Sequence, residues 1–216
     1  MSIQSQALKF GATILQNLPE VPEDIMQRWI EKPKTLRKVL TEALLPSNQN
    51  PKWVEKNGVI SFEITSTGLT GQQWIEYFEK KWIKISQWAR YLLLSPDFKP
   101  TNGLKSRIEV LKGSLFIDDN DRTTKKICTM AENRKLTKPN AEAACLVRDM
   151  FTDKELEEMD LYWIVVFHKP IKDFDGGPGL LSAGRRDDGS WLGAYGDRSD
   201  DGWRRGRGFA FATSIS

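Results

Sequence analysis

The segment LYWIVVFHKPI, residues 161–171, is a strongly apolar run that ends at Pro170. Its aromatic and β-branched residues predict a strand. Up to Met159 most apolar residues recur at helical spacing, whereas beyond it they lie in short runs separated by Gly- and Asp-rich turns. We therefore predict an α+β chain whose helices lie mostly before residue 160 and whose last strands include residues near 162–168 and 208–213.

The Pro/Asn/Ser stretch PSNQNP, residues 46–51, is the best candidate for a linker. It divides the chain into an N-terminal helical segment, residues 1–45, and an α+β body, residues 52–160, and a C-terminal β region follows at 161–216. The fold expected is thus a mainly helical N-terminal body joined to a C-terminal β region. Helical spacing predicts helices over 5–18, 22–32 and 34–45 in the first segment.

Within the body, residues 58–65 and 106–116 alternate in the way that is typical of strands. Thr70, Ser86 and Asn140 each precede a helical pattern and are expected as N-caps. Helices are predicted over residues 70–81, 86–94, 121–135 and 140–151, with Trp74, Phe78 and Trp88 in the core. Another helix begins at Thr152, where Glu155 three residues on completes a capping box.

Candidates for catalysis or metal binding are few. We interpret His168, the single histidine, as a buried, hydrogen-bonded residue at a strand end, and Cys128 and Cys145 as reduced, partly buried thiols. The acidic stretches DDND, 118–121, and DFDGG, 173–177, lack the ligand register of a calcium loop and are expected to be solvated turns. The sequence therefore predicts no enzyme, no cofactor and no metal site.

The charge and hydropathy narrow the class of partner. The net charge of +3 is too small for a dedicated nucleic-acid-binding protein. No apolar run approaches the roughly 20 residues that span a bilayer, and no secretion signal is recognisable at the N-terminus. We expect a soluble protein without membrane insertion, either cytoplasmic or displayed on a larger particle, and the sequence leaves a homo-oligomer open.

The charged residues change in kind near the C-terminus. From Ser182 to Ser216 every cation is Arg and every anion is Asp, and Lys, Glu, Gln and Met are absent. The 181 residues before carry 19 Lys against 7 Arg and 14 Glu against 10 Asp. Codons that end in a pyrimidine encode Arg, Asp, Gly, Ser and Tyr but never Lys, Glu, Gln, Met or Trp. The four residue types absent from this stretch therefore all belong to the excluded set. The only residues of that set present are Trp191 and Trp203.

This C-terminal pattern resembles the variable region of the target proteins of diversity-generating retroelements. In that family an error-prone reverse transcriptase rewrites template adenines, and the copy replaces the 3′ end of the target gene. The stretches DGSW, 188–191, and RGRGFAFA, 205–212, are similar to the Gly-Ser-Trp and terminal Gly-Phe signatures of the C-type-lectin-like fold of these proteins. The resemblance implies a lectin-like C-terminal β region that displays a hypervariable ligand-binding surface.

On this resemblance, Trp191, Leu192, Trp203, Phe209 and Phe211 are expected to form a fixed frame. The ligand is a protein or another surface whose identity differs between variants. The expected exposed and substitutable surface consists of Gly184, Arg185, Arg186, Asp187, Asp188, Gly193, Tyr195, Asp197, Arg198, Ser199, Asp200, Arg204 and Arg205.

An alternative interpretation of the C-terminal stretch is that it binds nucleic acid. The stretch GWRRGRGF, 202–209, resembles Arg/Gly segments that bind RNA through stacking and phosphate contacts. The five Asp residues between Ser182 and Ser216 would repel phosphate, so nucleic acid is the weaker candidate.

Overall fold

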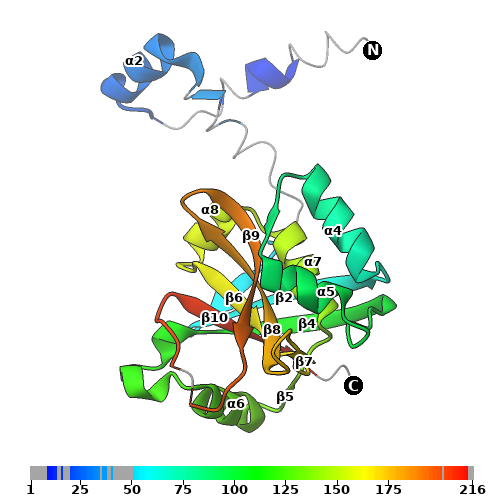
Figure 1. Ribbon diagram of the computed structural model, residues 1–216. Coiled ribbons are helices and arrows are strands. Elements are labelled where there is room, and N and C mark those ends of the chain that lie inside the picture. The colour runs from blue at the N-terminus through cyan, green and yellow to red at the C-terminus, as the bar shows by residue number, and fades with distance from the viewer. Residues whose placement is uncertain are drawn as a thin grey trace. The chain divides into compact units, whose positions relative to one another are not determined.

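The computed structural model describes residues 9–13, 16, 20–34, 36–37, 40, 51–200 and 202–213 (Figure 1). The chain consists of two compact units, Met1–Asn50 and Pro51–Ser216. In the first unit, helix α2 spans Glu23–Glu31 and begins after Pro22, which confirms the helix predicted over 22–32. The helices predicted over 5–18 and 34–45 lie partly outside the described residues.

The second unit is built on one mixed ten-stranded sheet. Its strands are β1 (Val54–Lys56), β2 (Val59–Thr67), β3 (Lys84–Ile85), β4 (Asn102–Lys112), β5 (Leu136–Thr137), β6 (Trp163–Val166), β7 (Ile171–Lys172), β8 (Pro178–Arg186), β9 (Gly189–Gly196) and β10 (Arg207–Thr213). Its helices are α4 (Gly71–Lys80), α5 (Gln87–Leu94), α6 (Thr124–Asn133), α7 (Glu142–Met150) and α8 (Asp153–Glu158), with 3-10 turns η1 (Gly113–Leu115) and η2 (Asp119–Asp121).

The strand order is β1-β2-β4-β10-β6-β8-β9-β3, with β5 beside β10 and β7 beside β8. The neighbours pair antiparallel except β10 with β6 and β3 with β9, which pair parallel. The C-terminal strand β10 thus lies in the middle of the sheet, between β4 of the body and β6. Strands from both sides of residue 160 form one sheet.

Each face of the sheet supports its own hydrophobic core. Strand β6 alternates between them: Ile164 and Val166 pack under α4, α5, α7 and α8, and Val165 belongs to the core beneath α6. Strand β10 does the same, with Ala210 on the first face and Phe209 on the second. Figure 1 shows α4, α5 and α7 grouped together and α6 apart from them. Because successive residues of β6 face opposite cores, both faces of the strand are buried. The segment 161–171 is therefore apolar almost throughout and does not alternate with polar residues.

Local signals place the helices as expected. The Thr70, Ser86 and Thr152 hydroxyls accept hydrogen bonds from the backbone N–H three residues on, and capping boxes form at Thr70 and Thr152. Asn140 accepts from the N–H of Glu142, so it caps the turn that leads into α7. Trp74 and Phe78 are buried, and Trp88 packs against the same core.

The predicted change of period after Met159 is confirmed. Every described helix ends before residue 160, and β6 and β10 occupy the segments predicted for the last strands. The strands predicted over 58–65 and 106–116 correspond to β2 and β4, except that β4 ends at Lys112 and a 3-10 turn follows. The body before residue 160 therefore supplies long strands as well as helices. Of the described helices, none has the length and apolar character needed to cross a membrane.

Candidate ligand-binding site

Four residues from distant parts of the sequence form one row across the sheet. The registers pair Trp191 of β9 with Gly184 of β8, Gly184 with Trp163 of β6, and Trp163 with Arg207 of β10. Residues in register lie on the same face of a sheet. This face is the one that carries the core beneath α6, because Val165, two residues after Trp163, belongs to that core.

The indole of Trp163 lies in space that two glycines leave open. A Cβ at Gly184 would lie 2.2 Å from the Trp163 ring, and a Cβ at Gly193 would lie 2.7 Å from it. Both glycines are buried, and Trp163 itself is only 8% exposed. The prediction that Gly184 and Gly193 belong to the exposed, substitutable surface is therefore wrong, because any side chain there would collide with the indole.

Guanidinium groups stack on the aromatic rings around Trp163. Arg186 lies 4.6 Å from the ring centroid of Trp191 and 5.4 Å from that of Trp163. Arg185 lies 4.6 Å from the Tyr162 ring, and its Nε donates to the Leu161 carbonyl at 3.1 Å. Such stacking holds the charged groups over apolar surface while leaving their in-plane N–H donors available.

A second stack continues toward β10. The rings of Trp163 and Tyr195 meet edge to face at 5.8 Å, and Tyr195 meets Trp203 in the same way at 5.7 Å. Arg207 lies 4.2 Å from the Tyr195 ring and 5.2 Å from the Trp203 ring. Burial lowers the pKa of the Arg207 guanidinium, Tyr195 opposes that shift, and the positive charge of Arg204 adds to it.

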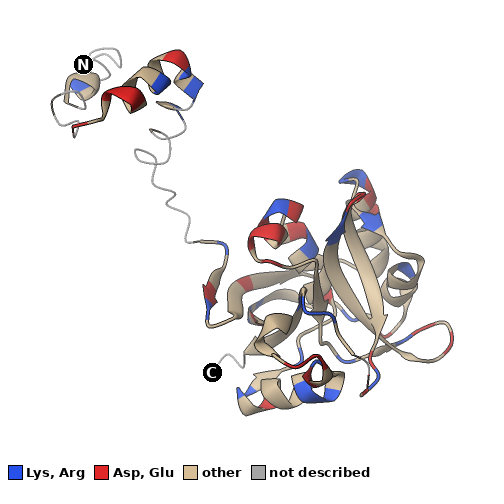
Figure 2. Cartoon of the chain, turned by 90° about the vertical axis from the view of Figure 1, so that its left-hand side faces the viewer, with Lys and Arg blue, Asp and Glu red and all other residues tan. Residues whose placement is uncertain are grey.

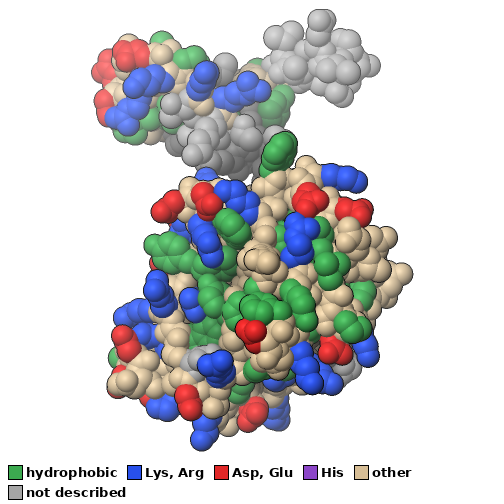
Figure 3. Space-filling view, in the orientation of Figure 1, with side chains coloured by type: hydrophobic (Ala, Val, Ile, Leu, Met, Phe, Trp, Pro, Cys, Tyr) green, Lys and Arg blue, Asp and Glu red, His purple; other side chains and the backbone are tan. Residues whose placement is uncertain are grey.

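These residues surround a pocket of about 610 Å³. Figure 3 shows hydrophobic side chains next to Lys and Arg side chains over the β8–β9 hairpin. Four of the lining residues are cationic and one is anionic, so the pocket favours a ligand with negative charge. The lining residues are Tyr162, Trp163, Arg185, Arg186, Asp187, Tyr195, Arg204, Gly206 and Arg207.

The turn that joins β8 to β9 is held by Asp188. Its carboxylate accepts from Lys84 Nζ and from Trp191 Nε1, each at 2.8 Å, and these two hydrogen bonds lower its pKa. The charged residues of the hairpin gather at this tip (Figure 2). Asp188 thus fixes the turn that carries Arg186 and Asp187 to the edge of the pocket.

The helices anchor the hairpin from the opposite face. Arg148 of α7 is buried, donates to the Gly184 carbonyl and forms an ion pair of 3.0 Å with Asp153. Asp153 also accepts from the Ser190 hydroxyl at 2.8 Å. Burial lowers the pKa of Arg148, and the negative charge of Asp153 opposes that shift. The two strands that carry the site are therefore tied to α7 and α8.

The loop between β9 and β10 is anchored on the first residues of α6 and on the segment before it. Arg122, 3% exposed, donates through Nε to the Trp203 carbonyl at 3.0 Å and also pairs with Asp119. The Trp203 N–H donates to the Arg122 carbonyl at 2.8 Å, and Trp203 Nε1 donates to the Thr124 hydroxyl at 2.9 Å. Farther back, the Lys125 N–H donates to the Ser199 carbonyl at 3.1 Å. This loop is long but has fixed attachment points.

The structure brings some of the predicted site residues together and leaves others apart. Arg185, Arg186, Asp187, Tyr195 and Arg204 line the pocket. Asp188 supports the turn, and residues 197–200 follow β9 toward the α6 side without lining the pocket. The exposed residues of the predicted surface are Arg186, Asp187, Asp188, Arg198, Ser199, Asp200, Arg204 and Arg205, and the half-buried ones are Arg185, Tyr195 and Asp197.

The predicted frame needs one correction. Leu192, Trp203, Phe209 and Phe211 are buried as expected, but Trp191 is only partly buried and lies between Lys84 and Arg186. Sequence reasoning also missed Tyr162, Trp163 and Arg207. Their signal was available in part, since Tyr162 and Trp163 begin the apolar segment and Arg207 begins the last strand, but only the strand registers bring them together.

The lone histidine and the thiols have structural surroundings. His168 is fully buried: its Nε2 accepts from the Leu181 N–H at 2.9 Å, so its Nδ1 donates to the Lys169 carbonyl at 2.7 Å. Burial lowers the pKa of His168 to about 4. Cys128 and Cys145 are free thiols, and burial raises the pKa of both. The prediction of a buried, hydrogen-bonded histidine is confirmed. Cys128 is partly buried as predicted, whereas Cys145 is fully buried.

The two acidic stretches form turns. Asp118 accepts from the Asn120 N–H at 2.9 Å, and Asp173 accepts from the N–H groups of Asp175 and Gly177 at 2.9 and 2.7 Å. Over the described part of the chain, no group of three or more His, Cys, Asp or Glu side chains is arranged to hold a metal ion.

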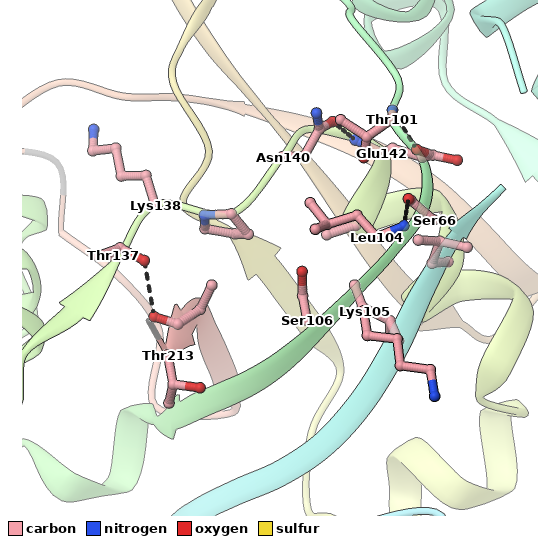
Figure 4. A pocket seen from close by; sticks show the side chains of 15 residues that line it. Ser66, Thr101, Leu104, Lys105, Ser106, Thr137, Lys138, Asn140, Glu142 and Thr213 are labelled. Atoms are coloured by element: carbon pink, nitrogen blue, oxygen red, sulfur yellow. Dashed lines mark hydrogen bonds between the residues drawn. The ribbon is translucent and has the colours of Figure 1, made fainter. Parts of the chain in front are cut away.

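A second pocket, of about 300 Å³, lies between β2, β4, β5, α7 and the end of β10 (Figure 4). The buried Glu142 carboxylate at its edge accepts from the Thr67 N–H, the Gly68 N–H and the Thr101 N–H at 3.0, 3.2 and 3.1 Å. Ser66 accepts from the Leu104 N–H at 2.9 Å. These polar groups hold neighbouring loops together, so we interpret their role at this pocket as structural.

Comparisons with family models, with curated proteins and with solved structures found no match for this chain.

Proposed function

We propose that this chain is a diversified ligand-binding protein, the target protein of a diversity-generating retroelement. One observation carries the proposal: residues 185–187, 195, 204, 206 and 207, all within the C-terminal stretch in which every cation is Arg and every anion is Asp, converge on one pocket. The described Arg and Asp residues between Ser182 and Thr213 are exposed or half-buried, whereas Leu192, Trp203, Phe209 and Phe211 are buried. Substitutions at exposed positions usually change stability by no more than about 0.5 kcal/mol.

We further propose a C-type-lectin-like character for the C-terminal β region. The arrangement of β6, β8, β9 and β10, with polar residues on the turn and loop between them, supports this. The proposal assigns the chain no catalytic step, since His168 is used in two structural hydrogen bonds and burial disfavours both thiolates.

The DNA beside the gene tests the diversification. We expect a near-repeat of the 3′ end next to a reverse-transcriptase gene, with mismatches only at adenines. The mismatches should fall in codons of exposed residues, such as Arg186, Asp187 and Arg204, and spare those of Trp203 and Phe209. The absence of a repeat, or mismatches spread equally over both sets of codons, would contradict the proposal.

Binding is tested by panning a random peptide library displayed on phage against the full chain. Peptides that bind the chain, and that fail to bind a variant with Arg186, Asp187 and Arg204 replaced by Ser, support a ligand-binding surface at the pocket. Failure to enrich any peptide on the intact chain counts against it.

Nucleic acid is the alternative ligand, favoured by the guanidinium groups stacked on aromatic rings around the pocket. It predicts tight binding of single-stranded oligonucleotides that weakens steeply with added salt. Asp187 in the lining and Asp188 on the adjacent turn favour a ligand other than a polyanion.

A further inference from the structure

The Arg207 side chain lines the pocket and lies against two aromatic rings. It begins β10, in register with Trp163, and its backbone N–H donates to the Arg204 carbonyl at 3.2 Å. Two aromatic rings, Tyr195 and Trp203, hold the guanidinium at 4.2 and 5.2 Å. Because Trp203 is 5% exposed and fixed by Arg122 and Thr124, one side of this clamp is rigid.

The charge of Arg207 has no anionic partner within the described residues. No described carboxylate lies within 4.0 Å of it, and no hydrogen bond between described residues uses its side chain. Arg186 and Arg204, which line the same pocket, also form no ion pair with a described carboxylate. A half-buried charge is normally paired or hydrogen-bonded, because removing it from water is costly.

The ring contacts of Arg207 use its positive charge, and the N–H donors of its side chain have no acceptor among the described residues. The aromatic rings interact with the guanidinium as a cation, and its five N–H donors still require acceptors. The planar fork of donors matches a carboxylate, which accepts two parallel hydrogen bonds. An acceptor of this shape that enters the pocket would complete the coordination.

We propose that Arg207 binds a carboxylate of a protein ligand, an Asp or Glu side chain that enters the pocket. The inference rests on the proposed ligand-binding function and names the chemistry of its ligand. The Tyr162 and Trp163 rings in the lining provide apolar surface for the methylene groups of such a side chain. Asp187 in the lining disfavours a string of phosphates more than a single carboxylate.

On this proposal, Arg207 and the exposed residues of the pocket contact different parts of the ligand. Arg207 belongs to the central strand and contacts the buried Trp203, so it serves as a common contact for an acidic residue. The exposed Arg186, Asp187 and Arg204 surround it and select the neighbours of that residue. Variants of the exposed positions should then keep a shared preference for an acidic residue at one ligand position.

The test is a titration of the full chain, followed through the side-chain Nε–Hε resonances of its arginines by NMR. The probes are the blocked tripeptide Gly-Glu-Gly, the matched Gly-Gln-Gly, and oligothymidylate. We expect Gly-Glu-Gly to shift the Arg207 resonance to saturation and Gly-Gln-Gly to leave it unchanged. Arg207→Gln should weaken the Gly-Glu-Gly response at the other pocket arginines by at least about tenfold, because a charge-assisted hydrogen bond is lost. Arg207→Lys should restore part of it.

Arg205→Gln is the matched control, because Arg205 is exposed and adjacent but does not line the pocket. The backbone amide spectrum of each variant establishes that it is folded. An equal loss in Arg205→Gln, equal responses to the Glu and Gln peptides, or a preference for oligothymidylate would overturn the inference. If library peptides nevertheless bind through the exposed positions, the proposed function stands and only the carboxylate anchor fails.

Discussion

Gly184 and Gly193 lie beneath the indole of Trp163, and neither position has room for a side chain. Both glycines belong to the stretch whose composition indicates a substitutable surface, so composition alone does not separate variable positions from structural ones. Glycine is favoured at both places because the Trp163 ring of β6 takes the space that a Cβ would fill.

We predict that Gly184→Ala destabilises the protein by about 1–3 kcal/mol, because the new Cβ forces the Trp163 ring to move. The measurement is unfolding by denaturant. Gly202→Ala is the control: Gly202 is exposed, and its added Cβ meets nothing within 4 Å, so the change should stay within about 0.5 kcal/mol. Equal effects of the two substitutions would refute the packing of the indole on Gly184.

His168 predicts a pH dependence of stability. Its folded-state pKa is lowered from 6.5 to about 4, so between these values the unfolded chain binds a proton that the folded chain does not. Stability should therefore fall as the pH drops from about 6.5 to about 4, by up to about 3 kcal/mol, and this contribution should be constant above that window. The difference between the native chain and His168→Asn isolates it in unfolding experiments over this range. Parallel curves for the two would show that His168 is not buried in its neutral form.

At the scale of secondary structure, the sequence predicts most elements because their signals are local. Thr70 and Thr152 begin helices through their own hydroxyls, and the apolar run at 161–171 forms β6 and β7. The pairing of these elements is not local. The parallel pairing of β6 with β10 joins residues about forty positions apart, and no pattern within either strand specifies it.

The same limit applies to the site. Arg185, Arg186, Asp187, Tyr195 and Arg204 are identified from the residue types of the C-terminal stretch. Trp163 and Arg207 complete the pocket. Trp163 lies outside that stretch, and nothing in its sequence context distinguishes it from other apolar strand residues. The role of Trp163 and Arg207 follows from the registers of β6, β8 and β10, which only the three-dimensional structure supplies.

We predict that Arg122 holds the loop between β9 and β10 in place. Arg122→Met removes the donor to the Trp203 carbonyl and the ion pair with Asp119 while keeping much of the side-chain volume. We expect faster amide hydrogen exchange at Trp203 and Lys125, because the loop opens without global unfolding. Arg134→Met, at the exposed end of α6, serves as the control and should leave both amides unchanged. Unchanged exchange in Arg122→Met would show that the loop is not held by this residue.

At the scale of the whole unit, Pro51–Ser216 is one compact body whose sheet joins β1, β2 and β4, from before residue 160, to β10, β6, β8 and β9, from after it. The C-terminal stretch contributes β10 to the centre of that sheet and the exposed turn and loop to its surface. Neighbouring residues of this stretch therefore have two physical roles: buried side chains hold the sheet, and we propose that the exposed ones can be replaced.

The most direct test of this division is the fraction of folded clones in two displayed libraries, measured as resistance to protease. One library randomises the exposed positions Arg186, Asp187, Asp200 and Arg204, and the other randomises the buried positions Leu192, Trp203, Phe209 and Phe211. We expect most clones of the first library and few of the second to resist the protease, because exposed substitutions cost little and truncation of a buried aromatic costs about 3–5 kcal/mol. Equal fractions in the two libraries would contradict the proposal that the exposed C-terminal positions form a replaceable surface on a fixed frame.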